Sequence, residues 1–354
     1  MQAHGYSQSA FNRQSVLRCI LFLMGGNTPL KSLYLRACLL DVLMSFLPAE
    51  VDKIELSTQE GTEQNRLLVY QHEQHEFNRF EICQKEFVPV LLELYRDVER
   101  TGHAAQYYDK FKFRVQISKI LKFLFQFKPH LDNLHASWNR SPEMFVGFLN
   151  MLINDLIYSL DHGLDGIAEV RELEENTSSN LSESEQEQKT NEIGEKRDLI
   201  KYYMLLAYES LDLLYYISVQ IQKPFFHEHI LPRMATLVSV YLDRLAGRAA
   251  QLKIGNMEQY NFKPRFLLTT IVKMVLILSV NEEFLRALVG DDALFRAEYY
   301  EKAVRFLRKH NLLPSREVDK FEILLQELIA KADERRNIEY INVTMFLLLL
   351  LYGK

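Results

Sequence analysis

The stretch PRFLLTTIVKMVLILSV, residues 264–280, decides the fold class. Its only charged residues are Arg265 and Lys273, so a helix over this range is apolar on nearly every side. A helix of that kind is buried, because water would otherwise meet its apolar side chains. The sequence therefore predicts a central helix that other helices cover on both sides.

Helical spacing of apolar residues recurs along most of the chain. It predicts helices over residues 30–47, 87–100, 104–127, 144–172, 199–221, 230–245, 282–288, 297–310 and 315–332. No alternating strand pattern of useful length precedes the last dozen residues. Successive amphipathic helices without a strict repeat predict an all-α fold, an irregular armadillo-like α-solenoid of antiparallel helices.

Local signals set several of these boundaries. Pro129 is expected to stop the helix before it, and Gly102 is a candidate left-handed cap. Ser141-Pro142-Glu143 predicts a helix start, with Pro142 at the first helical position. Residues 51–64 are polar and are expected to form a loop.

The composition supports long helices with few turns. The 354 residues include 13 Gly and 9 Pro, about 4% and 3%, below the usual roughly 7% and 5%. An apolar share of 48% excludes a mostly disordered chain. The three cysteines, Cys19, Cys38 and Cys83, show no metal or redox spacing and are expected to be reduced packing residues. A net charge of −5 argues against a nucleic-acid partner.

Three segments stand apart from the helical pattern. Residues 1–26 form a divergent N-terminal segment without the features of a signal peptide. Residues 174–196 are acidic and polar, which predicts a mobile loop or a solvated helix extension. Residues 343–352 read VTMFLLLLLY, about half of the roughly 20 residues that a membrane span needs. This run is a buried strand, a helix end, or sequence from a truncated or mis-spliced reading frame.

Motifs that resemble metal or acid–base sites are weak. In Gln71-His72-Glu73-Gln74-His75 the histidines are three residues apart, whereas a zinc protease helix needs four. His227-Glu228-His229 would point its histidines apart on a helix. Asp291-Asp292 is typical of a helix cap. We therefore predict no catalytic residues, no metal ligands and no cofactor-binding residues, and no cofactor.

The segment KFKFR, residues 110–114, interleaves basic and aromatic side chains. Nucleic-acid binding, a phosphate- or partner-binding face and a solvated helix face are the possible interpretations. Alternation between core and surface favours a solvated basic face over residues 110–122, made by Lys110, Lys112, Arg114, Lys119 and Lys122. The tyrosines between Tyr202 and Tyr216 are expected to lie in the core.

Four blocks of sequence carry a family resemblance. The most specific block is Pro224-Phe225, Arg233-Met234-Ala235, Leu245, Gly247, Leu252-Lys253, Tyr260, Phe262, Pro264 and Leu267-Leu268. Upstream blocks occupy residues 95–118, 145–161 and 33–37. In this order they resemble the core of the ubiquitin conjugation factors that elongate ubiquitin chains, the fourth class of such factors. The resemblance covers residues 27–332.

The resemblance implies an elongated helical core followed by a U-box, a RING-like domain without zinc. The U-box docks a ubiquitin-conjugating enzyme and gives the family its ubiquitin ligase activity. Residues 333–354 do not resemble a U-box and have no counterpart in the family, so we expect a truncated core without that domain. Smaller departures are Val238-Ser239-Val240-Tyr241 and Arg248 after Gly247.

Two functional hypotheses follow from the resemblance. The first is the core scaffold of a chain-elongating ubiquitin ligase, acting in polyubiquitination and protein degradation, with the chain alone inactive for want of the U-box. The alternative is a non-catalytic helical scaffold or adaptor that binds ubiquitin-pathway partners. The implied partners are a ubiquitin-conjugating enzyme, ubiquitinated substrates and an AAA segregase of the valosin-containing type, in cytoplasm and nucleus. No membrane partner is expected.

Overall fold

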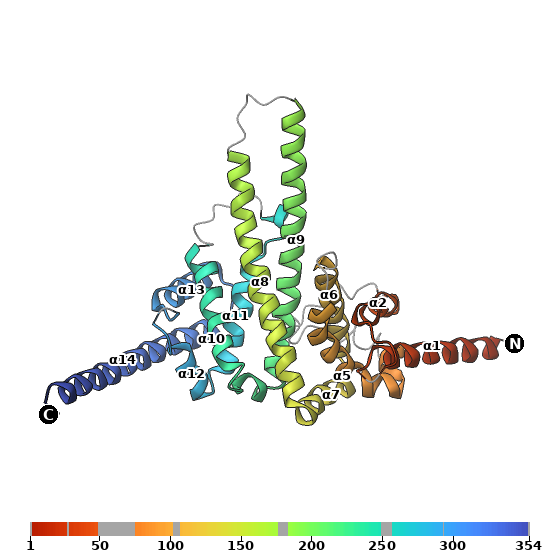
Figure 1. Cartoon of the computed structure of the whole chain (residues 1–354), viewed down its shortest axis with the longest axis horizontal. Coiled ribbons are helices and arrows are strands. Elements are labelled where there is room, and N and C mark those ends of the chain that lie inside the picture. Colours follow the sequence, from red (N-terminus) through yellow and green to blue (C-terminus); the bar gives the residue numbers. More distant parts are fainter. Residues whose placement is uncertain are drawn as a thin grey trace. The chain divides into compact units, whose positions relative to one another are not determined.

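The computed structural model describes residues 2–26, 28–48, 75–101, 107–175, 183–248, 257–292 and 294–352. Every regular element in these ranges is a helix, which confirms the all-α prediction. The chain divides into two compact units (Figure 1). Unit 1 comprises Met1–Pro224 and Glu258–Phe262, and unit 2 comprises Phe225–Met257 and Lys263–Lys354.

Unit 1 is built around a long helical hairpin of α8 and α9 (Figure 1). Against α5 pack α1, α4, α6, α7 and α8, whereas α6 also contacts α2 and α9. This packing of successive helices is consistent with an irregular α-solenoid. The elements are α1 (Gln2–Met24), α2 (Leu33–Met44), α4 (Glu76–Arg79), α5 (Glu81–Asp97), η2 (Val98–Thr101), α6 (Tyr107–Leu124), α7 (Lys128–Arg140), α8 (Pro142–Glu175), α9 (Glu183–Gln220) and η6 (Glu258–Tyr260).

Unit 2 has a buried central helix, as residues 264–280 predict. Helix α11 (Pro264–Leu278) lies between α10 and α14, and eight of its side chains are buried. Its Leu267, Ile271 and Leu278 are essentially inaccessible to water. Around it lie α10 (Leu231–Leu242), η5 (Asp243–Arg248), α12 (Glu282–Leu288), α13 (Ala297–His310) and α14 (Ser315–Tyr352), and η4 (Lys223–Phe226) leads in from unit 1.

Several predicted boundaries agree with the structure. Helices α12 and α13 have the predicted limits, and α8 begins at Pro142, as its capping signal predicts. Helix α7 was not predicted. Pro129, which we expected only to end a helix, lies in the first turn of α7, where proline's missing N–H costs nothing.

The three segments that the sequence set apart are largely helical in the described ranges. Residues 183–196 form the start of α9, so the loop interpretation is wrong there and the solvated-helix alternative holds. Helix α14 continues to Tyr352, which excludes a strand for residues 343–352. Helix α1 occupies Gln2–Met24. Residues 51–64, Gly102 and residues 176–182 lie outside the described residues.

Candidate functional site

The expected basic face of α6 is partly buried, which corrects the prediction of a solvated face. Arg114 lies inside unit 1, where its Nη1 donates to Asp155 Oδ1 at 2.5 Å and its Nη2 to Glu99 Oε2 at 2.8 Å. The Tyr95 hydroxyl donates to the other Asp155 oxygen at 2.7 Å. Burial raises the pKa of Asp155 to about 6, against the opposing charge of Arg114. This Tyr95–Arg114–Asp155 network ties α5, α6 and α8 together.

A second buried cation follows two turns later on the same helix. Lys122 is 3% exposed and lies 2.7 Å from Glu209 and 3.6 Å from Asp212, both on α9. Burial raises the pKa of Glu209, and the charge of Lys122 opposes that shift. Arg114 and Lys122 therefore hold helices together and are not available to a phosphate or a partner. Lys110 and Lys112 do lie nearer the surface, paired with Glu99 and Asp41.

The tyrosine-rich part of α9 packs in the core, as predicted. Tyr203, Tyr208 and Tyr215 are buried, and Tyr202 is half-buried. Tyr203 joins Phe111, Val115 and Leu206 in an apolar cluster between α6 and α9. The aromatic residues of KFKFR thus serve packing, with Phe111 and Phe113 both buried.

The histidine motifs lie apart from any metal-binding group. His227 and His229 occur in a turn, with ring centroids 5.3 Å apart, so our expectation that they point apart on a helix is wrong. His75 Nε2 lies 2.7 Å from the Phe46 carbonyl oxygen, and His72 lies outside the described residues. Among the described residues no three His, Cys, Asp or Glu side chains converge as metal ligands.

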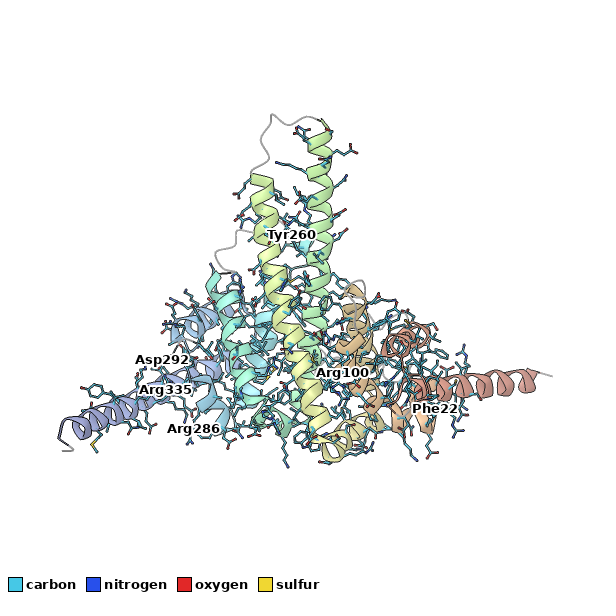
Figure 2. The ribbon with its side chains drawn as sticks, viewed as in Figure 1. Phe22, Arg100, Tyr260, Arg286, Asp292 and Arg335 are labelled. Carbon is cyan, nitrogen blue, oxygen red and sulfur yellow. The ribbon has the colours of Figure 1, made fainter. Side chains whose placement is uncertain are left out.

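Of the acidic pair in unit 2, Asp292 pairs with arginine, and neither residue is the N-cap of α12 or α13. Asp292 lies 2.5 Å from Arg335 Nη2 on α14, and the two residues are labelled in Figure 2. Arg335 Nη1 also donates to the Gly290 carbonyl oxygen at 2.6 Å. Asn281 and Arg296 are the N-cap residues of α12 and α13. Asp292 and the Gly290 carbonyl therefore hold Arg335 of α14 against the loop between those helices.

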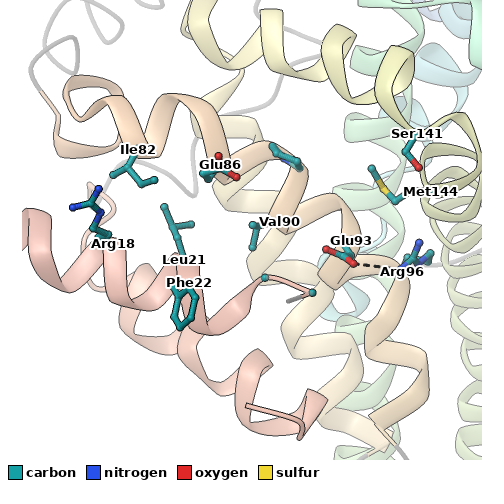
Figure 3. A pocket seen from close by; sticks show the side chains of 13 residues that line it. Arg18, Leu21, Phe22, Ile82, Glu86, Val90, Glu93, Arg96, Ser141 and Met144 are labelled. Atoms are coloured by element: carbon teal, nitrogen blue, oxygen red, sulfur yellow. Dashed lines mark ion pairs between the residues drawn. The ribbon is translucent and has the colours of Figure 1, made fainter. Parts of the chain in front are cut away.

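A groove of about 620 Å³ lies between α1 and α5 of unit 1, shown in Figure 3. We call it the α1–α5 groove. Phe22 on α1 is 60% exposed at this groove. The apolar lining residues are Leu21, Phe22, Ile82, Pro89, Val90 and Met144. This groove could not be predicted from the sequence, since exposure of one aromatic residue within an apolar run depends on the packing of α1 against α5.

Charged side chains stand at several points around the α1–α5 groove. Arg18 comes from α1, whereas Glu86, Glu93 and Arg96 come from α5 (Figure 3). Glu93 and Arg96 form an ion pair at 3.8 Å. A Cβ atom at Gly26 would lie 2.6 Å from Glu93 Oε1, so glycine there lets this carboxylate approach the end of α1. An apolar floor with charges of both signs is suited to a protein segment.

A second concavity, of about 760 Å³, lies between α6 and residues 192–202 of α9. Its floor holds Leu199 and Tyr202, and its rim carries carboxylates and lysines of both helices. The rim residues are Asp109, Lys112, Glu192, Glu195, Lys196 and Asp198. Both concavities offer surface for protein contacts rather than a constellation for bond-making chemistry.

The thiols give no sign of a nucleophilic site. Cys19, Cys38 and Cys83 are all free, and they are exposed, half-buried and buried, respectively. Burial raises the pKa of Cys83 to about 12, which keeps this thiol protonated at neutral pH. No helix in the described residues is both long and apolar enough to cross a membrane.

Comparison with known proteins places this helical chain among ubiquitin-pathway proteins. A family model described as "Ubiquitin elongating factor core" matches residues 1–329, so residues 1–26, which we expected to be divergent, belong to the matched region. The chain is 31% identical over 278 residues to the E4 ubiquitin-protein ligase UFD2 of Saccharomyces cerevisiae, covering 75% of this chain and 29% of that protein.

Two further relatives carry similar names. The probable ubiquitin conjugation factor E4 of Arabidopsis thaliana is 27% identical over 305 residues, covering 82% of this chain and 27% of its own. The ubiquitin conjugation factor E4 of Schizosaccharomyces pombe is 26% identical over 307 residues, covering 85% and 29%. This chain thus spans less than a third of the length of these relatives.

Proposed function

Because this chain belongs to the ubiquitin elongating factor core family, we propose that it is the core scaffold of a ubiquitin chain-elongation factor. The match over residues 1–329 carries this proposal, and the relatives named E4 ubiquitin-protein ligase or ubiquitin conjugation factor support it. The activity proposed for the whole factor is transfer of ubiquitin onto substrates that already carry ubiquitin, in polyubiquitination and protein degradation.

The proposed contribution of these residues is positional. A U-box ligase forms no covalent bond with ubiquitin but brings a charged conjugating enzyme next to the acceptor lysine, which converts a bimolecular encounter into a nearly unimolecular step. A rigid helical core serves this purpose if it binds one participant firmly. The buried Tyr95–Arg114–Asp155 network and the Lys122–Glu209 pair supply rigidity, and the α1–α5 groove supplies contact surface.

A ubiquitination assay with purified components tests the proposal. The 354 residues alone, with activating enzyme, conjugating enzyme and a mono-ubiquitinated substrate, are expected not to extend chains, because residues 330–352, which follow the matched core, belong to helix α14. The same chain, added in excess, is expected to lower chain extension by an intact factor of this family through competition for substrate or partner. Robust chain growth by the chain alone would contradict the scaffold role.

The partners and the cellular location are part of the same proposal. The ubiquitin-conjugating enzyme, ubiquitinated substrates and an AAA segregase are the proposed partners, in cytoplasm and nucleus. Pull-down with the immobilised chain separates two alternatives. Retention of polyubiquitinated protein or segregase without ligase activity favours the adaptor function, whereas retention of neither, together with no competition in the assay above, contradicts both.

A further inference from the structure

The concavity between α6 and α9 has an apolar floor that continues the core of unit 1. We call it the α6–α9 groove, and it lies where α6 runs beside α9 (Figure 1). Leu199 and Tyr202 form the floor, and both are half-buried. They pack against the buried apolar cluster that contains Phe111 and Tyr203. Apolar side chains at the edge of a core, inside a concavity of about 760 Å³, offer a contact for an apolar side chain of a partner.

One face of α9 places carboxylates directly beside this floor. Glu192, Glu195, Leu199 and Tyr202 all line the groove and lie at i, i+3, i+7 and i+10 along the helix. Residues with this spacing share one face of a helix. Asp109, in the first turn of α6, adds a carboxylate from the opposite side of the groove.

The two lysines of the rim are already neutralised by carboxylates from neighbouring helices. Lys112 Nζ lies 2.8 Å from Asp41 of α2, and Lys196 Nζ lies 3.0 Å from Glu169 of α8. Neither lysine therefore offsets the remaining carboxylates of the rim.

Three carboxylates of the rim keep an uncompensated negative charge. Among the described residues, no lysine, arginine or histidine forms an ion pair with Asp109, Glu192 or Glu195. Asp198, the fourth acidic residue of the rim, pairs with Lys201 at 2.8 Å. The α6–α9 groove thus combines an apolar floor with an acidic rim.

The sign of this charge selects the kind of partner. Carboxylates repel nucleic acids and anionic lipid surfaces. They attract a protein segment that carries lysine or arginine, because opposite charges across an interface favour association and exclude wrong partners. Arginine suits this groove especially, because its planar guanidinium stacks on aromatic rings and donates hydrogen bonds to carboxylates.

We propose that the α6–α9 groove binds a basic segment of a partner protein, in which arginine or lysine residues flank an apolar side chain. The apolar side chain packs on Leu199 and Tyr202, and the basic side chains pair with Asp109, Glu192 and Glu195. The proposal is independent of the ubiquitin function: peptide binding is measured on this chain alone, so its failure leaves the outcome of the ubiquitination assay untouched.

Fluorescence anisotropy with the full chain tests the proposal. The probe is a fluorescein-labelled heptapeptide with a central leucine between arginines. We expect saturable binding that weakens as the salt concentration rises, because salt screens exposed charges. A peptide with serine in place of the leucine should bind more weakly, and a peptide with glutamates in place of the arginines should not bind.

Glu192→Lys combined with Glu195→Lys reverses the charge of the rim and should weaken binding of the arginine peptide about tenfold. Both side chains are exposed, so the circular dichroism spectrum should be unchanged. The matched control is Glu172→Lys combined with Glu187→Lys. These two residues are exposed on α8 and α9 but do not line the groove, and their substitution changes the net charge equally. The control should bind the peptide as the wild type does.

The proposal is overturned if the wild-type chain does not bind the arginine peptide, or if the rim variant and the control variant bind it equally well. Equal binding of the leucine and serine peptides also overturns it, because the attraction would then be a general effect of charge without the apolar floor. Self-association of the wild-type chain in size-exclusion chromatography, lost in the rim variant, would overturn it in favour of a second copy of this chain as the occupant.

Discussion

At the scale of single residues, the most consequential contacts are the buried charges between helices. Arg114 is 2% exposed and joins α6 to α8 through Asp155, which is 3% exposed. Two charges in such a place gain from their mutual attraction only while both are present, because each alone is poorly solvated. The network thus fixes how these helices fit together and penalises any change that removes one partner.

Asp155→Asn should therefore be severely destabilising. The amide still accepts a hydrogen bond from Tyr95, but Arg114 keeps its charge in the interior with only the half-exposed Glu99 opposite it. We expect a loss of about 3–5 kcal/mol in the free energy of unfolding, the usual cost of breaking a buried pair. Urea denaturation at pH 7.5 measures it.

The control for that prediction is the double variant Asp155→Asn/Arg114→Met. Removing the cation as well leaves no buried unpaired charge, so the two substitutions together should cost less than the sum of the single ones. Strictly additive losses would mean that Arg114 and Asp155 do not depend on each other.

His130 is a buried, neutral histidine, and it should make the free energy of unfolding depend on pH. Burial lowers the pKa of this imidazole to about 4, and its Nε2 lies 3.1 Å from the Phe77 carbonyl oxygen. In the unfolded chain histidine titrates near 6.5, so between about pH 6.5 and 4 the unfolded state binds the extra proton. Its contribution to stability is complete above pH 6.5 and falls as the pH drops toward 4.

The measurement is the change in unfolding free energy between pH 7 and pH 5, compared between wild type and His130→Gln. Glutamine keeps an N–H donor for the Phe77 carbonyl but does not titrate. Between about pH 6.5 and pH 5 the unfolded wild type binds one proton that the folded protein does not bind. Over these roughly 1.5 pH units that proton lowers the free energy of unfolding by about 2 kcal/mol. The variant should therefore lose about 2 kcal/mol less stability than the wild type on acidification. Equal losses in the two proteins would show that His130 does not carry the effect.

These residue-scale features were only partly predictable. The sequence correctly placed Phe111 of the KFKFR segment and Tyr203 in the core, because apolar periodicity reports burial directly. It placed Arg114 and Lys122 wrongly on the surface. A cation can be buried only where a carboxylate lies beside it. The partners Asp155 and Glu209 lie on other helices, far along the chain, so the sequence alone does not show that they meet Arg114 and Lys122.

At the scale of elements, the α8–α9 hairpin shows how glycines set the distance between two helices. A Cβ atom at Gly166 of α8 would lie 2.9 Å from Cγ1 of the buried Ile200 on α9, which is too close. Gly194 of α9 has no atom within 4 Å of such a Cβ. The first glycine is needed for contact, whereas the second only weakens its helix.

Gly194→Ala should therefore stabilise α9 by up to about 1 kcal/mol, the difference in helix propensity between glycine and alanine. Slower amide hydrogen exchange in residues 186–200 and a higher melting temperature would record it. Gly166→Ala gains the same propensity but forces Ile200 aside, so it should be neutral or destabilising. An equal gain at both positions would show that the contact with Ile200 does not limit the spacing of the helices.

Helix limits followed the sequence best where a start or stop signal was unambiguous. Pro142 marks the start of α8, as the Ser141-Pro142-Glu143 signal predicts. Helix α7 was not predicted, because a proline such as Pro129 can end one helix or begin the next. For the acidic start of α9 the sequence left a loop and a solvated helix open, because a solvated helix with few apolar side chains has no periodicity to detect.

At the scale of the whole molecule, each unit has its own core. Buried side chains of α5, α6, α8 and α9 form that of unit 1, and those of α10, α11, α13 and α14 form that of unit 2. A part with its own hydrophobic core can unfold on its own. Because the whole sequence contains one tryptophan, Trp138 in unit 1, its fluorescence reports the unfolding of that unit alone.

Shortening a buried side chain in the core of one unit should therefore shift the unfolding transition of that unit alone. Leu328 in unit 2 and Leu152 in unit 1 are both fully buried, and Leu→Ala at such sites costs about 2–5 kcal/mol. Leu328→Ala should lower the midpoint of part of the circular dichroism transition and leave the Trp138 fluorescence midpoint unchanged, whereas Leu152→Ala should lower the fluorescence midpoint. If Leu328→Ala moved the Trp138 transition as far as Leu152→Ala does, the two units would unfold as one cooperative body.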